Sequence, residues 1–227
     1  MRDSIVLEDM KLISMTVLTF LLILIGSFAA GLLFTYTTSV ASKEKRKKQI
    51  DALISMVINL VIYIWIGKIL ANLSLFIQDP FAVLAYPSNG RALAIALVLL
   101  TIHIFYKVWF KKENMMPVVI QLLPVFIASA FMYEFLQMTV MGNKSHWMQV
   151  LLYAVLLLIY VLLQEGALRN WIIIYSWLII QLFFTITKSY TTVFQYSLSL
   201  TFIIVLFIVA FIGLFLQKRL SRSMVRG

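Results

Sequence analysis

Seven long apolar stretches dominate this chain of 227 residues. Each reaches or approaches the roughly 20 residues that a helix needs to cross a lipid bilayer. The connections between them are short, so we expect a single transmembrane domain over residues 1–227 with no separate soluble part. The predicted spans cover residues about 12–40, 52–76, 91–110, 117–140, 147–164, 171–187 and 197–216.

The composition supports lipid as the solvent of this chain. Hydrophobic residues make up 63% of it and charged residues 12%, whereas a soluble domain is nearer half apolar and a quarter charged. In lipid every backbone polar group must be satisfied internally, which leaves helices or a closed barrel. A barrel would show short alternating segments instead of long apolar runs. The sequence therefore predicts an all-α, polytopic helical bundle with about seven transmembrane helices.

The distribution of basic residues predicts the orientation. Thirteen of the 19 Lys and Arg residues fall on one side of the predicted bundle, and the richer side is expected to be cytoplasmic. We therefore expect a multi-pass protein of the cell membrane with its N-terminus outside and its C-terminus in the cytoplasm. This rule accounts for the net charge of +10 without a nucleic-acid partner. The thirteen are Lys43, Lys45, Arg46, Lys47, Lys48, Lys107, Lys111, Lys112, Arg169, Lys218, Arg219, Arg222 and Arg226.

Several classes of chemistry find no support in the residues. The chain has no cysteine, which excludes disulfides, thiolate metal sites and cysteine nucleophiles. Two histidines, His103 and His146, are too few for a multi-histidine metal or haem centre. Neither a His-Glu-x-x-His nor a Gly-x-Ser-x-Gly motif occurs. We therefore expect no metal and no cofactor, and we favour a non-enzymatic role.

Two ionisable residues within predicted spans form a candidate polar site. Burying a charge in hydrocarbon is costly unless the charge is paired, so such residues are functional candidates. Lys68 and Glu134 lie about 6 and 9 Å above the middle of their helices, on the outer side, at 1.5 Å per residue. Asn72 and Gln137 follow them by about one turn. These four side chains are expected to face the bundle interior, with Lys68 and Glu134 paired directly or through an amide or water. A structural ion pair, a snorkelling Lys68 and a site open to the outside remain alternatives.

The two histidines have their own alternatives. His103, in the inner half of its span, is added to the candidate polar site, because a proton relay would use such a residue; a structural bond to a neighbouring helix is the simpler explanation. His146 lies beside Trp147 at the expected outer boundary and is interpreted as interfacial. An acid/base pair of Glu134 and His146 is the one enzymatic arrangement that the residues allow.

A basic run after the first span forms a candidate contact with anionic lipid. Each Lys or Arg near an anionic membrane surface contributes around 1 kcal/mol of attraction. The alternatives are a topology determinant or an acidic partner. The run comprises Lys43, Lys45, Arg46, Lys47 and Lys48.

The residues match neither of two families that share this topology. Microbial rhodopsins have a retinal-binding lysine in the last helix, and the predicted span 197–216 has none. The SWEET sugar transporters place prolines in several spans, whereas only Pro117 and Pro124 lie in or at one here. The pattern of smooth spans favours a subunit, accessory or regulator of a membrane complex that binds lipid and another membrane protein or itself. A small transporter or channel with a polar site near Lys68 and Glu134 is the alternative.

Overall fold

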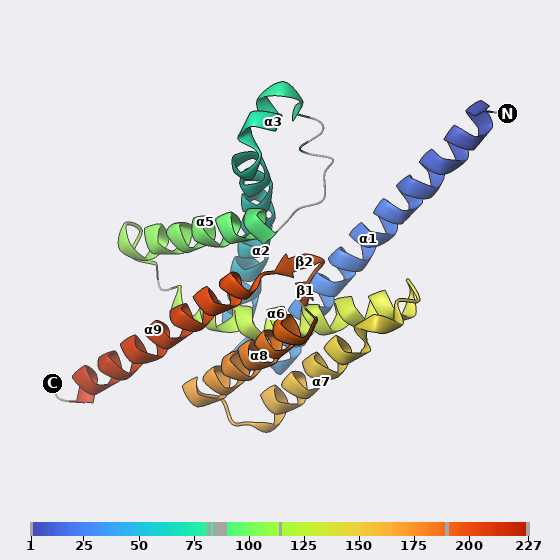
Figure 1. The fold of residues 1–227 in the computed structure, drawn as a ribbon. Coiled ribbons are helices and arrows are strands. Elements are labelled where there is room, and N and C mark those ends of the chain that lie inside the picture. Colours follow the sequence, from blue (N-terminus) through green and yellow to red (C-terminus); the bar gives the residue numbers. More distant parts are fainter. Residues whose placement is uncertain (1, 81–82, 84–89, 114, 189–190, 226–227) are drawn as a thin grey trace.

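Helices account for most of the computed structural model, which describes residues 2–80, 83, 90–113, 115–188 and 191–225. A short β-hairpin interrupts the helices late in the chain (Figure 1). The elements in order are α1 (Arg2–Thr38), α2 (Lys43–Ala71), α3 (Leu73–Gln78), α5 (Gly90–Trp109), α6 (Met116–Thr139), the 3-10 turn η1 (Lys144–His146), α7 (Trp147–Leu162), α8 (Ala167–Lys188), β1 (Thr191–Val193), β2 (Tyr196–Leu198) and α9 (Leu200–Val225).

Six helices in the described part of the chain are long and apolar enough to cross a membrane. They lie in α1, α2, α5, α6, α7 and α8, while α9 contributes a shorter apolar stretch at Leu200–Phe211. Long runs of Leu, Ile, Val and Phe form helices here because lipid offers no other partner for the backbone groups. The chain is therefore a multi-pass, all-α membrane protein, as the sequence predicts.

The second predicted span differs from the structure at both of its ends. The basic run is not a loop, because α2 begins at Lys43. At the other end α2 stops at Ala71, and Asn72, with φ −133° and ψ 38°, separates it from the short α3. The side-chain amide of Asn72 donates to the backbone carbonyl of Lys68 at 3.0 Å. Asn72 therefore stabilises the end of this helix.

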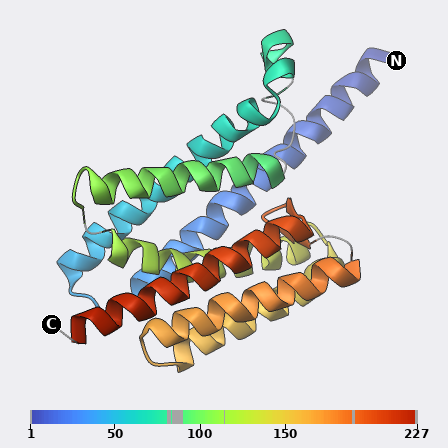
Figure 2. The same cartoon turned by 60° about the vertical axis from the view of Figure 1, so that its left-hand side comes forward.

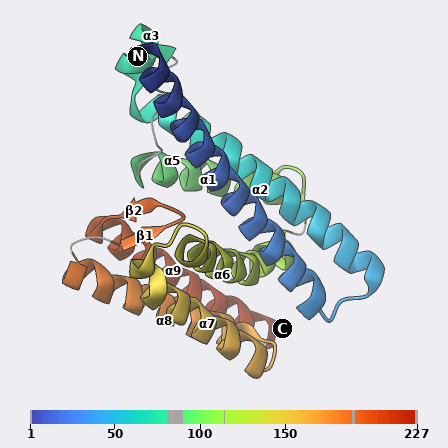
Figure 3. The same cartoon turned by 90° about the vertical axis from the view of Figure 1, so that its right-hand side faces the viewer.

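Helix α6 lies at the centre of the bundle. It runs between α1 on one side and α7, α8 and α9 on the other (Figures 2 and 3). Of its apolar window 44% is buried, compared with 17% in α2 and in α5. Helices α2 and α5 pack along each other at the edge of the bundle, and the first half of α1 extends beyond the other helices (Figures 1 and 2). The site and the lipid-facing surfaces are both organised around α6.

Small residues bring α1 against α6. Ser27, Gly31 and Thr35 are buried at four-residue intervals, so they share one face of α1. A Cβ added at Gly31 would lie 2.1 Å from the Ser129 hydroxyl and 2.6 Å from the carbonyl oxygen of Val125. The backbones can approach this closely only because position 31 has no side chain, as in other small-residue interfaces of membrane helices.

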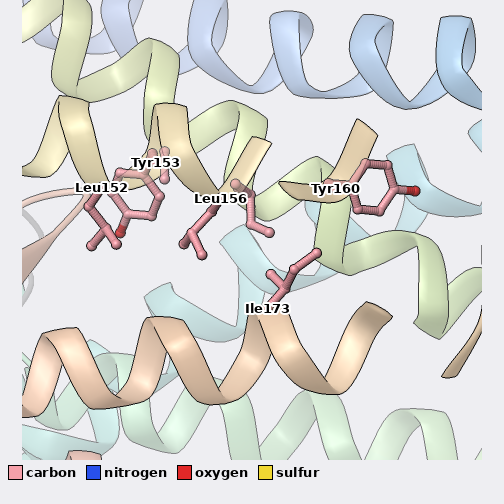
Figure 4. Close-up of a cluster of buried hydrophobic side chains, with 7 residues drawn as sticks. Leu152, Tyr153, Leu156, Tyr160 and Ile173 are labelled. Carbon is pink, nitrogen blue, oxygen red and sulfur yellow. The ribbon is translucent and has the colours of Figure 1, made fainter. Parts of the chain in front are cut away.

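Apolar side chains between α7 and α8 form the largest buried cluster. Tyr153, Leu156 and Tyr160 come from α7, and Ile173 points toward them from α8 (Figure 4). Ile127 of α6 joins the same cluster, and Tyr153 and Ile173 have no exposed surface. This packing fixes α7 and α8 against α6 and positions the polar side chains one turn farther along.

The β-hairpin between α8 and α9 is absent from the sequence-based prediction. Strand β1 pairs antiparallel with β2, with Val193 opposite Tyr196. The two turn residues, Phe194 and Gln195, have φ of 49° and 68°, as a two-residue hairpin turn of the right twist requires. Residues other than glycine rarely adopt such backbone angles. The ring of Phe194 is held by stacking on Phe28 of α1, at 5.2 Å between centroids.

The connections alternate between two ends of the bundle. The α1–α2, α5–α6 and α7–α8 connections and the end of α9 gather at one end (Figure 2), which we call the basic end because twelve of the thirteen basic residues lie in or beside these segments; Arg226 lies outside the described residues. The α6–α7 turn and the β-hairpin lie at the other, which we call the hairpin end (Figure 3). The predicted grouping is confirmed for the described basic residues, while the side of the membrane that each end faces stays a prediction.

Candidate functional site

A buried carboxylate at the hairpin end is the centre of the candidate site. Glu134 lies in the last turns of α6 and is 2% exposed. Nδ1 of His146 donates a hydrogen bond to its Oε2. The chain can return this quickly because Gly142 adopts φ +68° in the α6–η1 turn, a backbone conformation that glycine adopts at little cost. The two groups form an ion pair when the imidazole is protonated.

The predicted pairing of Glu134 with Lys68 is wrong. The partner of Glu134 is His146, and neither predicted amide joins the two charges, since Asn72 binds the backbone of its own helix. Lys68 lies on the part of α2 that packs against α5. The neighbouring Gly67 shows how close the two helices are, because a Cβ added there would lie 2.4 Å from the carbonyl oxygen of Ala92. The sequence argument matched the depths of two helices but could not show which helices are neighbours.

Gln137 lies beside Glu134, as the sequence predicts, and binds a tyrosine. Its side-chain amide donates to the Tyr133 hydroxyl at 2.9 Å, and both residues are about 3% exposed. The hairpin tip closes this region, because the Phe194 ring lies edge-on to Tyr133 at 5.3 Å. One turn of α6 therefore carries three buried polar side chains under the aromatic tip of the hairpin.

A second polar cluster joins α7, α8 and β1. The Thr191 hydroxyl donates to Oε1 of Gln181 at 2.7 Å and accepts from the Gln149 amide at 3.1 Å. The Gln181 amide donates to Oε1 of Gln149 at 3.3 Å, which closes a three-membered ring. Trp177 Nε1 donates to the Tyr153 hydroxyl at 3.2 Å. The Phe126 ring meets Tyr153 at 6.4 Å and Phe194 at 6.1 Å, and Phe194 meets Tyr133, so the two clusters are neighbours.

His103 lies away from this site. Its Nδ1 is hydrogen-bonded to the Tyr63 hydroxyl at 2.5 Å, and the rings meet edge-on at 5.9 Å. Both residues are half-buried between α5 and α2. The simpler sequence-based explanation, a histidine bonded to a neighbouring helix, is confirmed. The predicted residues Lys68, Asn72, Glu134, Gln137 and His103 therefore do not converge on one site, and whether any of them has a function stays a prediction.

The basic run occupies the first turns of α2 at the basic end. Arg46 is half-buried, with its guanidinium 5.0 Å from the centre of the Tyr36 ring and one nitrogen donating to the carbonyl of Ala41 at 3.3 Å. The other members are exposed: Lys43, Lys45, Lys47 and Lys48. Arg46 therefore stabilises the α1–α2 turn. The four exposed lysines are accessible to anionic lipid, and their binding to it stays a prediction.

The arrangement can perform two kinds of work. The Glu134–His146 pair has the elements of an acid/base couple, a buried carboxylate and an imidazole whose side chain is 18% exposed. The amide and hydroxyl groups around it bond to one another. These bonds order the hairpin against α7 and α8, so the groups serve the fold. The second role uses the hydrogen bonds among Gln149, Gln181 and Thr191, and the first uses the Glu134–His146 bond alone.

Sequence reasoning missed most of these partners. Tyr133, Tyr153 and Trp177 were hidden among the many aromatic residues of apolar spans. Gln149 and Gln181 gave a usable signal, because an amide within a predicted span generally needs a partner on another helix. Thr191 gave none, since its partners depend on a hairpin that was not predicted.

No protein-family model, curated protein or solved structure matches this chain. The functional argument therefore depends on the geometry described above.

Proposed function

We propose that this protein is a non-enzymatic subunit, accessory or regulator of a membrane protein complex in the cell membrane. The observation that supports this most directly is the internal bonding of the buried polar groups. Glu134 binds His146, Gln137 binds Tyr133, and Gln181 binds Thr191. Groups bonded in this way hold the fold together and are not arranged to receive a substrate.

The α2–α5 pair is the surface that we propose for the partner. These two helices lie at the edge of the bundle (Figure 2) and bury little of their apolar windows. The half-buried Tyr63–His103 pair lies between them. A polar pair at a lipid-facing edge is better placed against protein than against acyl chains. The proposed partner is a transmembrane helix with a hydrogen-bonding side chain at this depth.

Site-specific photo-crosslinking tests the proposal. A photoreactive phenylalanine analogue replaces Ile102 of α5, which is 57% exposed, or Ile179 of α8, also 57% exposed, as the matched control. We expect a single protein adduct of defined mass from position 102 and none from 179, and co-purification of that protein in stoichiometric amount in mild detergent. His103→Leu should weaken the co-purification. Equal adducts from both positions would contradict the surface.

The transporter alternative has lost its main argument, because Lys68 and Glu134 do not form one site. It would become the better hypothesis if the purified chain were free of partners and carried ions or small solutes across proteoliposome membranes. Loss of that flux in Glu134→Gln, with the fold intact, would assign the activity to the Glu134 region.

A further inference from the structure

An apolar groove lies between three helices of the bundle. Side chains from α6, α8 and α9 line a cavity of about 430 Å³. This volume falls within the range of small-molecule sites in proteins, about 300–1,000 Å³. The lining includes Phe126, Trp171, Ile173, Ile174, Trp177 and Ala210.

The wall of the groove is held rigidly. The Trp177 indole donates to the Tyr153 hydroxyl at 3.2 Å, and the Phe126 ring meets Trp177 edge-on at 5.3 Å. The Phe126 ring also meets the Tyr153 ring at 6.4 Å, so both groove-lining rings contact a residue that does not line the groove. A preformed apolar site of this kind binds an apolar chain without the cost of ordering its own walls.

Asn170 precedes the groove-lining face of α8 at the basic end, about one turn before Ile173 and Ile174. Asn170 immediately precedes Trp171, and its Oδ1 is buried without a hydrogen-bond partner among the described residues. The neighbouring Arg169 is 9% exposed. Its guanidinium lies 4.0 Å from the centre of the Tyr160 ring and one nitrogen donates to the Tyr160 carbonyl at 3.4 Å, while its Nε lacks such a partner. Buried polar atoms are nearly always bonded, so these atoms indicate a missing group. A hydroxyl would serve Asn170, and a phosphate oxygen would serve Arg169.

The charge at this end selects the ligand. The α8 and α9 helices that wall the groove carry Arg169 at the start of α8 and Lys218, Arg219 and Arg222 near the end of α9. Basic residues at a membrane surface favour anionic lipids over zwitterionic ones. We propose that the groove is a specific binding site for one acyl chain of an anionic glycerophospholipid, with its headgroup at the basic end beside Asn170.

Fluorescence quenching by brominated lipid tests this site. The protein is reconstituted in phosphatidylcholine vesicles that contain a few per cent of phosphatidylglycerol brominated along its chains. Trp171 and Trp177 line the groove, so we expect quenching several-fold above the level that random lipid contact gives. The excess should fall when either is replaced by Phe but not in Trp65→Phe, since Trp65 is an exposed residue of α2.

A pair of variants on α9 supplies the control. Ala210→Phe fills the groove, whereas Ile208→Phe adds an aromatic ring at a position that is 54% exposed and does not line it. We expect the excess quenching to disappear in the first variant and to persist in the second. Thermal unfolding of both confirms that each is folded. If Ala210→Phe does not fold, unbrominated phosphatidylglycerol added in excess must abolish the quenching of the native protein.

Three results would overturn the proposal. Quenching in proportion to the fraction of brominated lipid would show that the groove has no preference. Equal quenching by brominated phosphatidylcholine would refute the role of the headgroup charge. A second copy of the chain or another protein crosslinked to position 209 would show a protein occupant in place of a lipid.

Discussion

The imidazole of His146 donates from Nδ1 to the carboxylate of Glu134, across the turn that joins α6 to α7. Glu134 is 2% exposed, while the side chain of His146 is 18% exposed. A carboxylate buried this deeply in a membrane bundle is strongly destabilising without a donor. The bond therefore explains how α6 can carry an acidic residue close to its end and still pack against α7.

Removing either partner of this bond should destabilise the fold. We expect Glu134→Leu or His146→Leu to lower the free energy of unfolding by about 2 kcal/mol each, because hydrogen bonds to charged groups are among the strongest. The double variant should lose less than the sum of the two. Unfolding in detergent, followed by tryptophan fluorescence, measures all three. Additive losses would contradict the bond.

Two controls separate this pair from other charges. Glu113→Leu breaks the ion pair with Lys107, whose 3.3 Å contact is solvent-exposed, and should cost about 0.5 kcal/mol or less. Lys68→Met combined with Glu134→Leu should give additive losses, because these residues are not partners. Coupling between Lys68 and Glu134 would instead restore the pairing that the sequence suggested.

The fold was predictable from the sequence to a large extent, because lipid leaves the chain few choices. A long apolar run must be helical. Its ends are less certain, because α1, α2 and α9 each extend nine or ten residues beyond one end of the predicted span. The run at 117–140 became α6, Met116–Thr139, and the run at 91–110 became α5, Gly90–Trp109. What escaped prediction was local. The break at Asn72 depends on one side-chain bond, and the hairpin turn uses Phe194 and Gln195 in place of the usual Asn-Gly signal.

The candidate site was less predictable, because it depends on which helices are neighbours. Depth along a helix can be calculated from the sequence. Packing then places Lys68 against α5 and Glu134 beside α7, and a single sequence carries no information on that choice. The sequence suggested His146 as a partner of Glu134 only as a conceivable acid/base pair, and the structure joins the two by a hydrogen bond.

The hairpin should be anchored by the Thr191 hydroxyl. This group bonds both Gln181 and Gln149, so Thr191→Val keeps the shape but leaves two amides short of a partner, at a cost of about 1–3 kcal/mol. Thr192→Val is the matched control, since its side chain lies on the opposite face of the strand. Hydrogen exchange of the hairpin amides should accelerate in the first variant only. Equal acceleration in both would show that the polar ring does not hold the hairpin.

Close packing of α1 on α6 should make Gly31 intolerant of a methyl group. Gly31→Ala places a Cβ 2.1 Å from the Ser129 hydroxyl, so α1 must move away, and we expect a loss of about 1–3 kcal/mol. Gly26→Ala on the same helix meets nothing within 4 Å and should be neutral or slightly stabilising, since Ala is the better helix former. Thermal unfolding in detergent compares the two. Equal stability of both variants would contradict the α1–α6 contact.

The orientation of the bundle can be tested with single cysteines, because the chain has none of its own. Ser42 lies at the basic end, immediately before α2, and Ser145 lies in η1 at the hairpin end; both are exposed. The excess of basic residues predicts that the basic end is cytoplasmic. In intact cells an impermeant thiol reagent should therefore label Ser145→Cys and leave Ser42→Cys unmodified. After the membrane is permeabilised, both should react, which controls for access. Labelling of Ser42→Cys alone in intact cells would invert the topology and would place the four exposed lysines of α2 outside the cell, away from the anionic leaflet that they are expected to contact.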